Sequence, residues 1–177
     1  MIRYFLVFVF MTVLAGASFA QESAGSIETI RAQAAEAETA FWKKVDASTD
    51  WGKWLVEVKP YWDKISEATM VAAASAAGFD PTGMSEQAAA AKGNEIALVF
   101  YKALQGITPP EELKVYHAKI MATYAELTKS VPADHEQLLQ KEEATKKLSN
   151  DAVQELAQVL SRHQVPQDII EEFMKKQ

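Results

Sequence analysis

The pattern that decides the fold lies in WGKWLVEVKPYWDKI, residues 51–65. Its large apolar residues recur at steps of three, four and seven, which places them along one stripe of an amphipathic helix. Residues 47–50 supply candidates for the N-cap. Pro60 falls inside the stretch, and because proline removes a backbone donor we expect a kink or break near Lys59. The stripe predicted to face the core consists of Trp51, Leu55, Val58, Trp62, Ile65 and Ala72.

Helical periodicity continues on both sides of this stretch, and no segment alternates at period two for long enough to indicate a strand. Gly78 is predicted to cap the C-terminus of the helix that contains residues 51–65. Ser85 is predicted to cap the next helix, in which Gly93 either admits a close backbone neighbour or marks a late start at Asn94. Further helices are predicted over about residues 27–45, 109–127 and 133–162, with a short one after Pro166. The sequence therefore predicts an all-α fold, an antiparallel bundle of four to six helices.

The clearest local helix signal follows Gly106. Thr108 is predicted to be the N-cap, with Pro109 at the first helical position, where its missing donor costs nothing. Glu111 stands three residues after Thr108 and would complete a capping box. The helix that starts there carries one apolar seam, made of Leu113, His117, Ile120, Tyr124 and Leu127.

The first twenty residues read as a cleavable secretory signal. Arg3 makes the start positive, residues 4–15 are apolar and uncharged, and Ser18 and Ala20 are the small residues that signal peptidase requires. The apolar run is shorter than the roughly 18 to 20 residues that span a bilayer. We therefore expect cleavage between Ala20 and Gln21, a signal peptide over 1–20, one helical domain over 21–177 and no stable membrane anchor afterwards. The expected location is the periplasm or the cell exterior.

Composition limits the classes of partner. The chain has 177 residues and no cysteine, so neither a disulfide nor a lipid attached at a cysteine is available to it. Its net charge is −6, and loss of Arg3 with the signal would make it −7. An acidic chain of this kind is a poor ligand for nucleic acid or for an anionic membrane surface.

No motif in the sequence indicates catalysis or metal binding. None of the three histidines, His117, His135 and His163, has a histidine or carboxylate three or four residues away, which is the spacing of a helical metal site. His117 and His163 are instead predicted to be partly buried packing residues with one hydrogen bond each. Signatures of serine hydrolases and zinc proteases are missing as well. We therefore predict no cofactor, no metal and no enzymatic activity.

The one candidate ligand-binding feature is the aromatic cluster between Trp42 and Trp62, which contains all four tryptophans of the chain. Trp51 and Trp62 are expected in the core, and Trp54 and Tyr61 on the neighbouring row toward the helix flank. The favoured interpretation is that these rings are core, because aromatic side chains dominate core energetics. The alternative is a stacking surface for a sugar or a cationic head group, with Trp54, Tyr61, Trp51 and Trp62 as its binding residues.

A weak resemblance accompanies the segment Ile107-Thr-Pro-Pro-Glu-Glu-Leu-Lys-Val-Tyr-His117-Ala-Lys-Ile120. It resembles a segment of exported bacterial helical proteins of unknown function, in which a Pro-Pro-Glu-Glu helix start is followed by a histidine two turns later. The resemblance implies an exported bacterial bundle and carries no activity. Helical periplasmic chaperones are a second comparison, but their repeated Leu-Thr-x-x-Gln motif is missing, since Leu127-Thr128 is followed by Lys-Ser-Val.

Four functional interpretations remain open from the sequence. The favoured one is an exported, non-catalytic helical module that binds or interacts with a partner. The second is a protein that binds a small envelope ligand through the aromatic cluster, and the third is a periplasmic protein of the chaperone or stress-response kind. The fourth is an enzyme, which would need convergent carboxylates or a histidine within a cleft.

Overall fold

The computed structural model of the chain describes residues 32, 35–36, 39–76, 79 and 83–175, and of residues 172–175 it describes the backbone alone. Within this part all regular structure is helical, which confirms the predicted all-α fold. The elements are α3 (Asp50–Ser75), α4 (Glu86–Gln105), the 3-10 helix η1 (Glu111–Leu113), α5 (Lys114–Thr128), α6 (His135–Arg162) and α7 (Gln167–Lys175). The signal-like segment 1–20 lies outside the described residues, as do residues 27–31, 33–34 and 37–38 of the helix predicted over 27–45.

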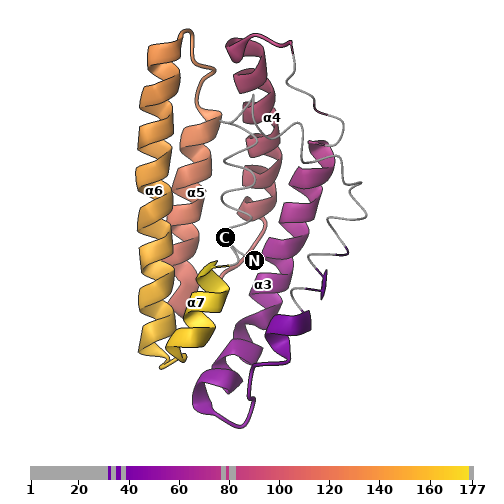
Figure 1. Cartoon of the computed structure of the whole chain (residues 1–177), viewed down its shortest axis with the longest axis vertical. Coiled ribbons are helices and arrows are strands. Elements are labelled where there is room, and N and C mark those ends of the chain that lie inside the picture. The colour runs from indigo at the N-terminus through magenta and orange to yellow at the C-terminus, as the bar shows by residue number, and fades with distance from the viewer. Residues whose placement is uncertain (1–31, 33–34, 37–38, 77–78, 80–82, 176–177) are drawn as a thin grey trace.

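Consecutive long helices run in opposite directions, as Figure 1 shows. α5 packs against both α4 and α6, and α3 packs against α4. α7 lies at the end of the bundle where α3 begins and α6 ends. One apolar core extends through all of these helices, and its largest fully buried side chains are Tyr116, Tyr124 and Phe100. The arrangement is an up-and-down bundle in which short connections keep neighbours in sequence as neighbours in space.

Helix α3 does not break at Pro60, contrary to the prediction. It continues to Ser75, with Ala76 as its C-cap, so it also ends before Gly78. Pro60 itself is exposed, whereas Val58 and Tyr61 on either side of it are buried in the same core. One lost backbone bond is outweighed because most of a helix's stability in a protein comes from packing of its apolar face.

Helix α4 begins at the predicted cap and contains one of the two glycines near it. The amide of Ala88 donates to Ser85 Oγ at 3.2 Å, so α4 begins with the predicted cap and the late start at Asn94 is wrong. Gly93 is buried inside the helix. Gly106 is the C-cap residue.

The predicted capping box at Thr108 is wrong. Thr108 is exposed and non-helical, the first helical turn is η1, and no side chain caps the start of η1 or of α5. The reason is the pair Pro109-Pro110, because a residue that precedes proline is disfavoured in the helical region. Pro109 therefore cannot begin a helix, and Pro110 has the extended angles φ −57° and ψ 156°. The seam predicted for this helix is confirmed, since Leu113, His117, Ile120, Tyr124 and Leu127 are all buried.

Polar side chains connect α6 to its neighbours. Lys119 Nζ on α5 lies 3.0 Å from Glu155 Oε2 on α6. Near the other end, Lys141 Nζ on α6 donates to Asn94 Oδ1 on α4 at 2.9 Å. Burial lowers the pKa of Lys141, and Glu126 opposes that change. The two contacts lie toward opposite ends of α6 and join it to both α5 and α4.

Candidate functional site

The four predicted ligand residues of the aromatic cluster lie on α3, and their burial is the reverse of the prediction. Trp54 is 6% exposed and Tyr61 is 3% exposed, whereas Trp51 and Trp62 are half-buried at the edge of the core. The expectation that Trp51 and Trp62 form the core, with Trp54 and Tyr61 outside it, is therefore wrong. The buried stripe of α3 consists of Trp54, Leu55, Val58, Tyr61, Ile65, Ala68 and Ala72.

The error has a physical cause. Leu55, Val58, Ile65 and Ala72 belong both to the predicted stripe and to the observed one. Helical periodicity therefore predicts that an apolar face exists, but it leaves the rotation of the helix about its axis undetermined by part of a turn. The position of the neighbouring helices and of the chain before α3 decides which tryptophan turns inward.

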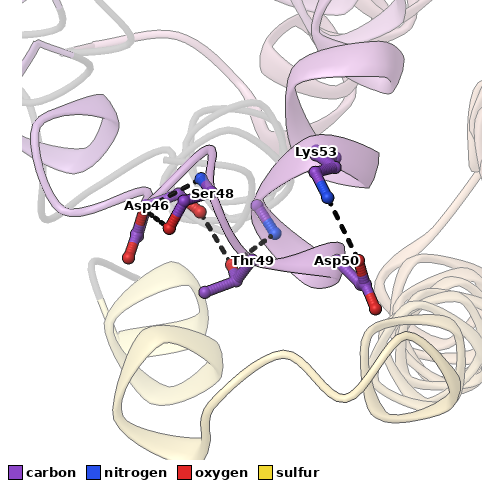
Figure 2. Close-up of polar contacts among 6 residues, drawn as sticks. Asp46, Ser48, Thr49, Asp50 and Lys53 are labelled. Carbon is purple, nitrogen blue, oxygen red and sulfur yellow. Dashed lines mark hydrogen bonds and ion pairs between the residues drawn. The ribbon is translucent and has the colours of Figure 1, made fainter.

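The chain before α3 fixes the first turn of the helix (Figure 2). Asp46 Oδ1 accepts hydrogen bonds from the Ser48 amide at 2.9 Å and the Ser48 hydroxyl at 2.7 Å, which keep the pKa of Asp46 below its ordinary value. Thr49 Oγ1 donates to the Asp46 carbonyl at 2.7 Å and accepts from the Gly52 amide at 3.1 Å. Thr49 is thus the N-cap, from within the predicted residues 47–50.

Gly52 permits this arrangement and was missed in the sequence analysis. A Cβ atom at this position would lie 1.9 Å from the Asp46 carbonyl oxygen, far inside contact distance. Glycine inside a helix costs about 1 kcal/mol relative to alanine, so its presence one turn after a cap was an available signal of close backbone approach.

Trp54 stacks on a histidine from the other end of the chain. Its ring lies 3.9 Å from the His163 ring, centroid to centroid, with 8° between the planes. His163 is the C-cap residue of α6, and the chain turns there through Gln164 in the left-handed region at φ 55°. Trp54 Nε1 has no hydrogen-bond partner among the described residues. The stack joins the start of α3 to the end of α6.

A second group of rings joins α3 to α5. Tyr61 Oη lies 3.2 Å from His117 Nδ1, so His117 has the kind of hydrogen bond predicted for it. Trp62 packs edge-on to Tyr61 at 4.9 Å between centroids and lies 5.7 Å from Tyr116. These rings fill the space between the two helices with the protein's own side chains.

Burial keeps the polar atoms of this second group uncharged. Burial raises the pKa values of Tyr61 and Tyr116 well above their ordinary value, so both phenols retain their protons. Burial also lowers the pKa of His117, and a backbone hydrogen bond with Leu104 opposes that change in part. Beside a neutral imidazole, the protonated Tyr61 hydroxyl either donates to an unprotonated Nδ1 of His117 or accepts from a protonated one, according to the tautomer.

One shallow hollow on the surface is not lined by these rings. It has a volume of about 420 Å³, and Ala157, Gln158, Ser161 and Arg162 on one face of α6 line it. Neither Trp54 nor Tyr61 is among these lining residues. Nowhere in the described part of the chain do three or more histidine, aspartate or glutamate side chains gather as metal ligands would. Of the predicted ligand residues, Trp54 and Tyr61 are buried in the core in separate ring contacts, and Trp51 and Trp62 are half-buried at its edge.

Comparison with known proteins adds no relative. No protein-family model matches the sequence, and no significant match was found among curated proteins or among solved structures. Among the described residues, no helix combines the length and the apolar character needed to cross a membrane.

Proposed function

We propose that this protein is an exported helical bundle that acts without catalysis, by binding another protein through its outer surface. Export is proposed from the signal-like segment 1–20. The observation that supports surface binding is the burial of Trp54 and Tyr61, because rings that contact His163 and His117 inside the bundle are not available to an external ligand.

The surface offers apolar side chains at one end of the bundle. His135 Nδ1 lies 3.2 Å from Glu86 Oε2, which brings the start of α6 beside the start of α4 (Figure 1). Exposed large apolar residues lie within four positions of Glu86 or His135 in the sequence: Met84, Val131 and Leu139. Exposed apolar groups within a polar rim are typical of protein interaction sites.

Charge at this end defines the partner's chemistry. Asp134, Glu136 and Glu86 are exposed there. A complementary partner is a protein segment that presents an apolar side chain flanked by lysine or arginine, since opposite charges favour encounter and fix orientation.

The test is crosslinking in the native envelope with a matched pair of variants. Leu139 is 49% exposed near the proposed surface, and Val56 is 48% exposed on α3, which starts at the opposite end. We expect Leu139→Glu to abolish a specific crosslinked adduct and Val56→Glu to leave it unchanged. Retention of the adduct in Leu139→Glu, or loss in both variants, would contradict the proposed surface.

The small-ligand alternative predicts a different result. Sugars or choline-like cations would shift the tryptophan fluorescence of the protein saturably, and the shift would disappear in Trp54→Ala. That result, without a crosslinked protein, would replace the proposal with ligand binding.

A further inference from the structure

The His117 imidazole is the point at which three helices meet. The ring belongs to α5, Tyr61 on α3 hydrogen-bonds its Nδ1 at 3.2 Å, and a backbone hydrogen bond connects it with Leu104 in the last turn of α4. The residue is only 8% exposed. A change at this single ring therefore acts on all three helices at once.

The surroundings of the ring are neutral. α3 contributes the Tyr61 phenol, whose ring centroid lies 5.8 Å from that of the imidazole, and α4 contributes the backbone of Leu104. Between α5 and α6, Lys119 pairs with Glu155, and Glu126 acts on Lys141. No charged side chain of the described residues is among the causes of the shift in the pKa of His117.

A proton on His117 would disrupt this arrangement. An imidazolium ring donates from both nitrogens, so the Tyr61 hydroxyl could only accept from Nδ1. The new charge would be buried without an anionic partner, which is costly in a core. This cost favours states in which the ring reaches water, away from Tyr61.

We propose that His117 makes the contact of α3 with α4 and α5 acid-sensitive, so that uptake of one proton places an uncompensated charge where the three helices meet and loosens α3 from the bundle. The change reverses when the pH returns to neutrality, because only a proton is gained or lost. An exported protein of this kind would be closed in a neutral compartment and open in an acidic one.

The direction of the pH effect follows from the folded and unfolded pKa values. Burial holds the pKa of His117 in the folded protein below its ordinary value of 6.5. The unfolded chain therefore binds more protons as the pH falls below about 6.5. Stability is complete above that pH, falls as the pH drops toward the folded pKa, and levels off below it.

The experiment is urea unfolding at pH 7.5, 6.5 and 5.5, followed by tryptophan fluorescence, with each histidine replaced by glutamine in turn. The wild-type unfolding constant should rise by up to about tenfold between pH 7.5 and 5.5, the limit that one imidazole with an ordinary unfolded pKa sets over this range. His117→Gln should remove this rise. His135→Gln and His163→Gln are the matched controls and should retain it. A rise that persists in His117→Gln, or is absent in the wild type, overturns the proposal.

Two measurements on the wild type keep the proposal testable if His117→Gln fails to fold. NMR titration of the three imidazoles should find His117 the last to protonate as the pH falls. Hydrogen exchange, corrected for the intrinsic effect of pH, should show lower protection of α3 amides at pH 5.5 than at 7.5, with α6 unchanged. Titration of His117 at or above 6.5, or equal loss of protection in both helices, contradicts it.

Discussion

The starts of α3 and α5 each carry a threonine, Thr49 and Thr108, at a place where its side chain could cap a helix. At α3 the threonine caps, because its Oγ1 accepts from the Gly52 amide while the chain folds tightly against the first turn. At α5 the threonine lies outside the helix, and Leu113, which is fully buried, anchors the turn instead.

The first turns of α3 and α5 are stabilised by different interactions. The start of α3 uses hydrogen bonds between near neighbours in sequence, with glycine removing the steric obstacle. The start of α5 uses two prolines that hold the chain extended and an apolar anchor in the core. Substitutions in the two regions should therefore differ in effect.

The largest effect is expected from Gly52→Ala. The added Cβ would meet the Asp46 carbonyl at 1.9 Å, so the loop or the first turn of α3 must move. We expect the free energy of unfolding to fall by about 5 kcal/mol, a value at the upper end of the losses caused by single substitutions. Gly106→Ala is the control, since a Cβ there would meet its nearest neighbour at 3.5 Å. Urea titrations of the two variants provide the measurement, and equal losses would mean that the loop does not approach α3 so closely.

A smaller effect is expected from Trp54→Ala, which tests the orientation of α3. Trp54 is buried and stacked on His163, so its removal should cost about 3–5 kcal/mol. Trp51→Ala should cost about 1–2 kcal/mol, because only part of that side chain is removed from water. Thermal and urea unfolding of the pair would measure the difference. A larger loss of stability in Trp51→Ala than in Trp54→Ala would support the buried stripe predicted from periodicity.

The smallest effects separate the two threonines. Thr49→Ala should cost about 0.5–2 kcal/mol, because the Gly52 amide loses its acceptor. Thr108→Ala should change stability by less than about 0.5 kcal/mol, as exposed positions without a cap do. Matched urea midpoints for wild type and Thr108→Ala are the expected result. A full capping loss in Thr108→Ala would show that the helix starts there after all.

The sequence alone determined the features that rest on local periodicity and local chemistry. It predicted an all-helical chain, the cap at Ser85, the N-cap region at 47–50, and the seam from Leu113 to Leu127. These are predictable because spacing along a helix and a hydrogen bond across three residues depend on neighbours in sequence.

The tertiary structure decided which way α3 turns, whether Pro60 breaks it and where the ring partners lie. The contacts of Trp54 with His163 and of Tyr61 with His117 join residues 109 and 56 positions apart, and no local pattern encodes them. The same holds for Pro60, whose lost hydrogen bond is offset by a core that forms only when the other helices are in place. A helix carries several faces that its own sequence would allow to be buried, and the packing of its neighbours selects one.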